Sequence, residues 1–497
     1  MKRREFLRIG GAACVSSLGL DRLLLAQSPP APRGVLVNDI HSQLNETRVL
    51  CVERPTSLAD LQRLVRTAKK DGRAISIAGG RHAMGGQQFG ADTMLIDMRG
   101  LQSVIGFDEQ KGLVHVDAGL QWTPLVTHLL NCQAGAPKPW GIIQKQTGAD
   151  RLTLGGSLAA NVHGRGLKLK PFIGDVESFI LVDANGDPRT CSRRENPELF
   201  SLAIGGYGLF GIVAQVTLRL SRRCKLQRVV TIEKLDDVPA AFSRRIAEGC
   251  TYGDFQYSIA ADSDDYLREG VFSCYRPVAQ DVAMPQGQRE LKNDDWRNLL
   301  CLAHSDKRRG FDQYKKHYLA TSGQIYWSDT HQLSDYVDDY HCEVDRKTSA
   351  QCRGTEMITE IYVPRPDLPA FLTKVREDFE RNSVNLIYGT VRLIERDDES
   401  FLAWASKPYA CIIFNLHVDH TGPGREKAAR GFCGLIDRAI DMGGSYYLTY
   451  HRWATRRQVE TCYPRFAEFL KLKRKYDPTE RFQSDWYRHY RKMFLEA

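Results

Sequence analysis

The stretch Ala78-Gly79-Gly80-Arg81-His82-Ala83-Met84-Gly85-Gly86-Gln87 follows a short apolar segment, residues 74–78, whose composition is typical of a strand. Its glycines allow sharp turns and let main-chain N–H groups approach an anion closely. The embedded His82 can serve as a nucleophile or as a covalent tether. A segment so poor in packing side chains indicates a binding loop rather than part of a core.

Two further glycine-rich runs, residues 153–166 and 205–211, occur downstream. Three loops that expose backbone within one domain-length stretch indicate a large cofactor that bears phosphate. The spacing of Gly206, Gly208 and Gly211 formally matches the dinucleotide fingerprint, which requires a helix after the glycines. A β-branched, strand-like segment follows instead, and this excludes a Rossmann site.

Short elements of both kinds alternate up to about residue 222. Apolar residues at helical spacing predict a helix over 58–68, alternation predicts a strand at 114–119, and apolar, strand-like composition predicts strands at 94–98 and 213–220. Longer strands and amphipathic helices follow, and the last fifty residues are aromatic and basic. A chain of 497 residues exceeds one ordinary core, so we expect at least two domains.

Charge and cysteines exclude several classes of protein. The formal net charge is +9, but residues 1–27 contribute +3 of it, and the remaining +6 is too mild to indicate nucleic-acid binding. Residues 2–20 combine paired arginines with a short apolar stretch, which resembles a twin-arginine leader and predicts an exported, periplasmic protein. The thirteen cysteines are scattered without a C-x-x-C pair, so we expect individually buried thiols and no metal site.

The order of these motifs resembles the FAD domain of the vanillyl-alcohol-oxidase superfamily, the FAD-linked oxidases also called PCMH-type. The match covers about residues 45–222, and the chain's ending resembles the decaprenylphosphoryl-ribose oxidase branch. The resemblance implies an α+β fold, with a two-subdomain FAD-binding domain and a cap domain built on a large antiparallel sheet. The implied divisions are a signal at 1–27, an FAD-binding domain at 28–222, a substrate domain at 223–445, and a segment at 446–497 that returns to the FAD domain.

In that family the glycine loop holds the pyrophosphate, and the two later runs line the rest of FAD. Carried over to this chain, the resemblance implies cofactor contacts from Gly79, Gly80, Arg81, His82, Ala83, Met84, Gly155, Ser157, His163, Gly206 and Ile212. His82 aligns with the histidine that cytokinin dehydrogenases and aldonolactone oxidases bond to the flavin. The alternative is a loop histidine that only hydrogen-bonds phosphate.

The expected chemistry is hydride transfer from a CH–OH group of a sugar, polyol or aldonolactone to flavin N5. Such a reaction needs fixed donors over the ring and a group that takes the hydroxyl proton. Residues of suitable type are Arg392, Glu360, His417, Tyr450 and His451, and the resemblance to the ribose-oxidase branch implies that Glu360 and Arg392 lie on the substrate side. Two alternatives stay open, a dehydrogenase for amines or aromatic alcohols and a flavin-binding protein without turnover.

The predicted partners are a small-molecule substrate and either oxygen or a separate electron acceptor. The basic aromatic ending has two interpretations. It is either a terminal helix whose aromatic side chains dock on the FAD domain, which we favour, or a contact with a membrane surface or a polyprenyl-phosphate substrate.

Overall fold

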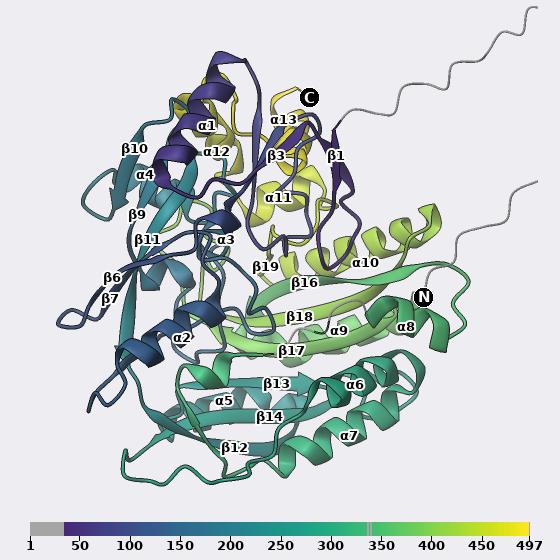
Figure 1. The fold of residues 1–497 in the computed structure, drawn as a ribbon. Coiled ribbons are helices and arrows are strands. Elements are labelled where there is room, and N and C mark those ends of the chain that lie inside the picture. The colour runs from purple at the N-terminus through teal and green to yellow at the C-terminus, as the bar shows by residue number, and fades with distance from the viewer. Residues whose placement is uncertain (1–33, 335–336, 338–339, 497) are drawn as a thin grey trace, which may run out of the picture. The chain divides into compact units, whose positions relative to one another are not determined.

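The glycine loop at 79–86 begins where a strand of a small parallel sheet ends. The structure is a computed structural model that describes residues 34–334, 337 and 340–496. The sheet has the order β3 (Cys51–Glu53), β5 (Met94–Asp97), β4 (Ile75–Ala78), and α1 (Leu58–Lys70) connects β3 to β4 (Figure 1). Ser57 begins α1 by accepting a hydrogen bond from the Asp60 amide, and the apolar face that predicted this helix is buried.

The other two glycine runs lie next to a second sheet, which has six antiparallel strands. Its order is β10-β9-β11-β7-β6, with β8 paired to β11. The strands are β6 (Val104–Asp108), β7 (Leu113–Asp117), β8 (Trp140–Ile142), β9 (Val176–Val182), β10 (Pro188–Ser192) and β11 (Ile212–Arg222), and the helices near them are α2 (Trp122–Cys132), α3 (Leu154–Ala160) and α4 (Pro197–Ala203). Strands β1 (Val35–Val37) and β2 (Thr47–Val49) pair separately.

The third glycine run leads directly into a strand. Gly208 and Gly211 have φ angles of +74° and +146°, which side chains rarely adopt, and β11 starts at Ile212. The sequence-based exclusion of a Rossmann site is therefore confirmed.

The second glycine run is a helix in part, which corrects the expectation of a loop. Thr153 caps α3 by accepting a hydrogen bond from the Gly156 amide at 3.2 Å. A Cβ at Gly155 would lie 2.9 Å from the Cβ of Ala118, so glycine lets α3 approach the end of β7 closely. The glycines here serve close packing rather than a loop conformation.

An eight-stranded antiparallel sheet forms the second half of the chain, with the order β15-β12-β14-β13-β17-β18-β16-β19. Its strands are β12 (Lys225–Lys234), β13 (Tyr252–Tyr257), β14 (Glu269–Val278), β15 (Ile325–Trp327), β16 (Gly354–Pro364), β17 (Leu386–Ile394), β18 (Tyr409–Asp419) and β19 (Ser445–Tyr446). Its helices are α5 (Val238–Ala247), α6 (Asn293–Ser305), α7 (Lys307–Leu319), α8 (Tyr340–Lys347), α9 (Leu368–Arg381) and α10 (Gly422–Ile440). The predicted α+β class with a large antiparallel sheet is confirmed.

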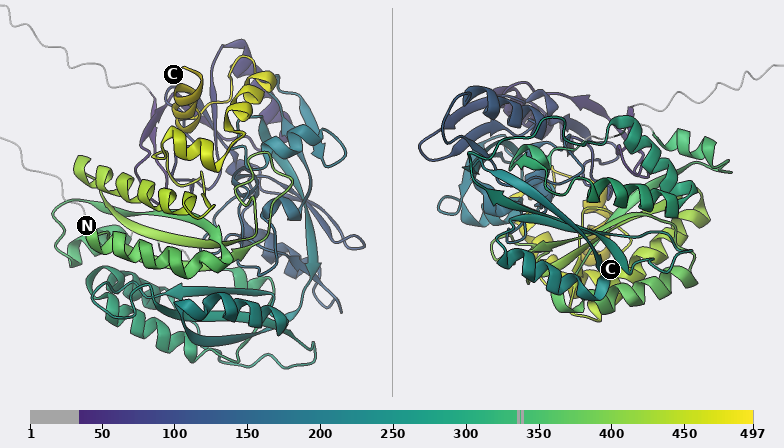
Figure 2. Two further views of the ribbon diagram at one scale, coloured as in Figure 1. Left: turned by 180° about the vertical axis from the view of Figure 1, so that it is seen from behind. Right: turned by 90° about the horizontal axis from the view of Figure 1, so that it is seen from below.

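Helices cover both faces of this sheet, as Figure 2 shows from below. Phe242 of α5 packs edge-on against Phe272 of β14, whereas Phe311 of α7 clusters with Val271. Because neighbouring strand residues point to opposite faces, α5 and α7 lie on opposite sides. The side that carries α7 is the one that contributes to the cavity described below.

The C-terminal helices contact the N-terminal part of the chain. They are α11 (Arg456–Cys462), α12 (Phe466–Tyr476) and α13 (Asp485–Leu495). The ring of Trp486 lies 4.8 Å from that of Tyr207, and Phe482 bridges Ile75 of β4. Gln87 of the glycine loop donates to the carbonyl of Thr449 at 2.8 Å.

Five short 3-10 helices complete the described part of the chain, η1 (Met98–Gly100), η2 (Phe172–Asp175), η3 (Leu235–Asp237), η4 (Thr330–Gln332) and η5 (Arg365–Asp367).

The predicted leader at 1–27 lies outside the described residues. None of the helices in the described part of the chain combines the length and apolar character needed to cross a bilayer.

One buried carboxyl predicts a pH-dependent stability. Asp175 of η2 is 6% exposed, and burial raises its pKa to about 8, so the folded protein favours its neutral form. The stabilisation this form provides is complete below about pH 4 and is lost as the pH rises through about 8. We expect Asp175→Asn, which stays neutral, to stabilise the protein at pH 8 by on the order of 2 kcal/mol and to have little effect at pH 4. Urea denaturation at both pH values measures this, and an equal effect at both would contradict it.

Candidate functional site

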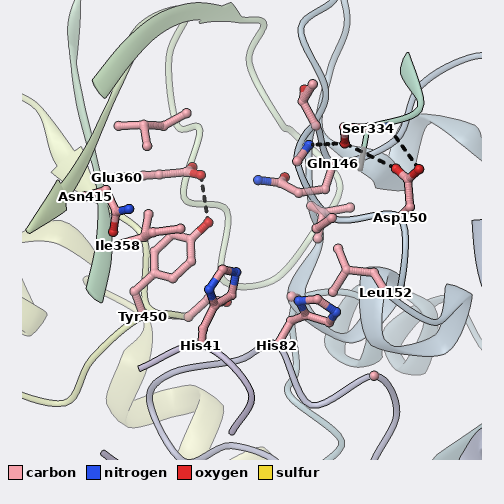
Figure 3. A pocket seen from close by; sticks show the side chains of 18 of the residues that line it. His41, His82, Gln146, Asp150, Leu152, Ser334, Ile358, Glu360, Asn415 and Tyr450 are labelled. Carbon is pink, nitrogen blue, oxygen red and sulfur yellow. Dashed lines mark hydrogen bonds between the residues drawn. The ribbon is translucent and has the colours of Figure 1, made fainter. Parts of the chain in front are cut away.

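A cavity of about 910 Å³ lies between the glycine loop, α3 and the eight-stranded sheet. Ligand sites typically enclose roughly 300–1,000 Å³, so this volume suits a large ligand with a substrate beside it. Figure 3 shows His82 and Leu152 on one side of the cavity and Glu360, Tyr450 and Asn415 on the other. Both halves of the chain therefore contribute walls to one site.

The wall formed by the glycine loop exposes backbone. A Cβ at Gly79 would lie 2.1 Å from Oγ1 of Thr153, and one at Gly80 would lie 2.2 Å from the carbonyl oxygen of Arg151. Segments 79–80 and 151–153 are therefore in contact, and side chains are excluded between them. Such a wall suits a pyrophosphate, which main-chain N–H groups and nearby cations bind.

The structure brings together most, but not all, of the predicted cofactor residues. Those that line the cavity are Gly79, Gly80, Arg81, His82, Ala83, Met84, Gly155 and Ile212. Ser157, His163 and Gly206 lie behind the wall. Ser157 accepts a hydrogen bond from Trp122 Nε1 at 3.2 Å, and a Cβ at Gly206 would lie 2.0 Å from the carbonyl oxygen of Leu202. These two residues support the packing of the wall.

Several lining residues are not identified by the sequence patterns. They include His41, Gln146, Thr153, Tyr207 and Thr449. Thr153 and Tyr207 lie within the two later glycine runs, so the sequence carries a signal for their positions, although neither is among the predicted cofactor contacts. His41 and Gln146 come from segments without a motif, and only the fold places them at the cavity.

His82 is buried beside a second histidine. Its ring centroid lies 5.7 Å from that of His41 in an edge-on arrangement, and 7% of the residue is exposed. Burial lowers the pKa of His82 to about 3. The imidazole is therefore neutral at physiological pH, the state in which a ring nitrogen has a lone pair for nucleophilic attack.

Glu360 of β16 is a fully buried carboxylate held by three side chains. Tyr450 donates to its Oε1 at 2.9 Å, and Tyr362 donates to Oε2 at 3.0 Å. Nε2 of His163 lies 2.8 Å from the same Oε2. Burial would raise the pKa of Glu360, but His163 and Arg392 outweigh burial and lower it below its ordinary value. Glu360 is therefore an ionised hydrogen-bond acceptor at the cavity.

Arg392 of β17 lies on the strand beside Cys411 of β18 and also lines the cavity. The residue is only 5% exposed, and its Nε and Nη1 make no hydrogen bond to any described residue. Buried donors normally have partners, so these two N–H groups indicate a bound oxygen atom from a ligand.

Two predicted catalytic residues, His417 and His451, lie away from the cavity lining. His417 is on β18, but it contacts Glu356 at the far end of the strand. His451 is buried against Phe432 and Tyr446, and burial lowers its pKa to about 3. The expectation that these histidines face the substrate differs from the structure. His417 lies at the far end of its strand, and His451 packs against Phe432 and Tyr446. Glu360, Arg392 and Tyr450 do lie together.

The remaining wall, from the second half of the chain, is aromatic and cationic. Tyr314 and Tyr318 of α7 stack at 4.2 Å, and the Arg228 guanidinium lies 4.6 Å from the ring centre of Tyr326. All four side chains line the cavity. This wall offers flat apolar surfaces and a fixed positive charge to a ligand.

Comparisons with known proteins identify the first half of the chain. Residues 49–192 match the family described as FAD binding domain. This part of the chain is therefore an FAD-binding domain of the kind found in FAD-linked oxidases. Its cofactor is FAD, and the exposed backbone at 79–80 and the large cavity fit that cofactor beside a small-molecule substrate.

The relatives differ in what their names say they do. An uncharacterized oxidoreductase from the fasciation locus of Rhodococcoides fascians is 30% identical over 43% of this chain, and the match spans 47% of that protein. An L-gulono-1,4-lactone dehydrogenase from Mycobacterium tuberculosis is 23% identical over 88% of this chain and 95% of its own length. Cytokinin dehydrogenase 9 from Oryza sativa is 30% identical over 38% of this chain and 36% of its own length. The chain thus spans about half or less of two of these relatives.

Proposed function

We propose that this FAD-dependent oxidoreductase oxidises a CH–OH group of a sugar, polyol or aldonolactone. The observation that carries the proposal is the pair formed by Glu360 and Arg392 at the cavity. An alcohol needs an acceptor for its hydroxyl proton and a cation for the charge that develops on its oxygen, and this pair supplies both. The similarity to an L-gulono-1,4-lactone dehydrogenase over 88% of the chain supports the same class of substrate.

Each residue has a defined role in this proposal. FAD, when bound, supplies the acceptor for the hydride. Glu360 accepts the hydrogen bond of the substrate hydroxyl and then its proton, while Tyr450 and His163 hold the carboxylate in place. Arg392 donates its two N–H groups to the substrate oxygen. The aromatic wall of Tyr314, Tyr318 and Tyr326 excludes water from the reacting carbon.

An anaerobic substrate screen tests the proposal. Sugars, polyols and aldonolactones are added to the purified flavoprotein without oxygen, and bleaching of the visible flavin band is followed. We expect one of these compounds to reduce the flavin. Reduction by an amine or an aromatic alcohol alone would support the alternative dehydrogenase, for which the cytokinin dehydrogenase relative argues. No reduction by any compound would favour a flavin-binding protein without turnover.

The acceptor and the location of the protein are further parts of the proposal. We propose that oxygen or a separate electron acceptor reoxidises the flavin. We also propose export by the twin-arginine route, because that route carries proteins that have already folded around a cofactor. The paired Arg3 and Arg4 support this.

A covalent bond between His82 and FAD gives a distinct prediction. The neutral, buried imidazole favours attachment to the flavin, so acid-precipitated wild-type protein should stay yellow and fluorescent. His82→Ala should give a colourless precipitate while the native variant keeps most of its FAD, because the pyrophosphate wall is unchanged. His317→Ala, elsewhere on the cavity, is the control and should keep the covalent flavin. A colourless precipitate from wild-type protein would contradict the bond and leave His82 as a hydrogen-bonding residue.

A further inference from the structure

A second group of titratable side chains lies at the end of β16 and β18, outside the cavity lining. Glu356 of β16 is paired in register with His417 of β18. His304 from the last turn of α6 and His341 from the first turn of α8 reach the same carboxylate. Figure 1 shows α6 and α8 near these ends of β16 and β18. The proposed oxidation uses none of these residues.

Three ligand atoms converge on one point. Nε2 of His304 lies 3.1 Å from Oε1 of Glu356, and Nδ1 of His417 lies 3.3 Å from the same oxygen. The three atoms all lie within 4.8 Å of one another. A tetrahedral zinc site with bonds of about 2.0–2.1 Å has ligand atoms about 3.3 Å apart, and the two spacings to Oε1 of Glu356 approach that value.

The nitrogen of His304 lies close to Glu356 without the geometry of a hydrogen bond. Its side chain is 4% exposed, and Nε2 makes no hydrogen bond to any described residue although Glu356 Oε1 is close. The orientation of the imidazole ring therefore does not give Nε2 of His304 and Oε1 of Glu356 the angle that a hydrogen bond requires. A buried imidazole nitrogen and a carboxylate oxygen that lie this close without hydrogen-bond geometry are arranged as two ligands of one ion would be.

Outer contacts hold the other two groups in place. The second carboxylate oxygen of Glu356 accepts from Tyr340 and lies 2.9 Å from Nδ1 of His341. The far nitrogen of His417 lies 3.5 Å from Oδ1 of Asp419. A Cβ at Gly354 would lie 2.2 Å from the His417 ring, so glycine allows that ring its position. Metal-binding histidines commonly have such a carboxylate on their other nitrogen.

We propose that His304, Glu356 and His417 bind a divalent transition metal ion of the Zn²⁺ class, with water in the fourth position. Two imidazoles and one carboxylate form a ligand set that Zn²⁺ favours. The ion ties α6 to the sheet, and Trp296, Leu299 and Leu300 of α6 line the cavity. The metal therefore stabilises one wall of the substrate site. No sequence motif predicts this metal site, because its ligands come from three separate elements.

The experiment uses the purified flavoprotein after treatment with a chelator. We expect calorimetric titration with Zn²⁺ to show saturable binding of one ion per chain and a raised melting temperature. Co²⁺ should give the intense visible bands of a four-coordinate site. Absence of saturable Zn²⁺ binding, or the weak spectrum of six-coordinate Co²⁺, would overturn the proposal.

Matched variants locate the ion. His304→Gln and His417→Gln should each weaken Zn²⁺ binding at least tenfold, whereas the control His420→Gln should bind as wild type. His420 lies on the same edge but hydrogen-bonds Thr355. Wild-type binding in both glutamine variants, or its loss in the control alone, would overturn the assignment. Flavin content and far-UV circular dichroism check that each variant folds. If a variant does not fold, the Zn²⁺ titration of the wild-type protein alone tests the proposal.

Discussion

Replacing Glu360 with glutamine should slow anaerobic flavin reduction by about 10²–10⁴-fold, the usual contribution of a positioned acid–base group. The amide keeps the size of the side chain but cannot take the hydroxyl proton. It also leaves Arg392 beside a neutral group. Stopped-flow absorbance with the substrate found in the screen measures the rate, and Glu395→Gln, on a partly exposed carboxylate paired with Arg365, is the control.

The pH dependence separates Glu360 from a histidine base. Because its pKa lies below its ordinary value of 4.5, Glu360 is ionised throughout the physiological range. The wild-type rate should therefore stay level as the pH falls from 8 to about 5. A rate that falls with a midpoint near 6.5 would point to a histidine as the proton acceptor. A Glu360→Gln variant with an unchanged rate would remove Glu360 from the chemistry.

Replacing Gly80 with alanine should lower the affinity for FAD at least tenfold, which is about 1.4 kcal/mol or more. The new Cβ would lie 2.2 Å from the carbonyl oxygen of Arg151, and a carbonyl of the main chain cannot rotate away as a side chain can. Segments 79–80 and 151–153 must then separate, and the backbone groups that face the pyrophosphate move with them.

The ratio of visible to protein absorbance after purification measures the FAD retained, and the loss should persist when FAD is added back at low concentration. Gly106→Ala is a suitable control, because no atom lies within 4 Å of its Cβ position and its φ is not positive. Full flavin content in the Gly80 variant would show that the close contact is not needed for the binding wall.

The FAD half of the protein was predictable because its function depends on backbone. Glycines at 79–80 and 208–211 are visible in a sequence, and the strand that follows Gly211 excludes a Rossmann site without a structure. The run at 153–158 differs from the predicted loop, because Gly155 there allows α3 to contact Ala118. A sequence shows that a side chain is absent, but not which neighbour needs its absence.

The catalytic candidates were harder to predict, because a strand residue of suitable type can face either side and either end of a sheet. Glu360 and His417 come from the paired strands β16 and β18, yet only Glu360 reaches the cavity. His417 lies at the strand end beside Glu356, and His451 turns into the packing around Phe432. The cluster of His304, Glu356 and His417 has no sequence signature for the same reason, since its members come from α6, β16 and β18.

The sequence by itself determined that glycine-rich segments expose backbone to a phosphate-bearing cofactor. It also determined that the chain mixes helices and strands, with longer strands and helices in its second half. Short-range chemistry suffices for that, since turns, helix faces and strand alternation depend on neighbouring residues. Only the tertiary structure decided that Glu360, Arg392 and Tyr450 meet opposite the glycine loop and that His304 reaches Glu356. Those encounters depend on strand register and on helix packing over the sheet, which join residues far apart in the chain.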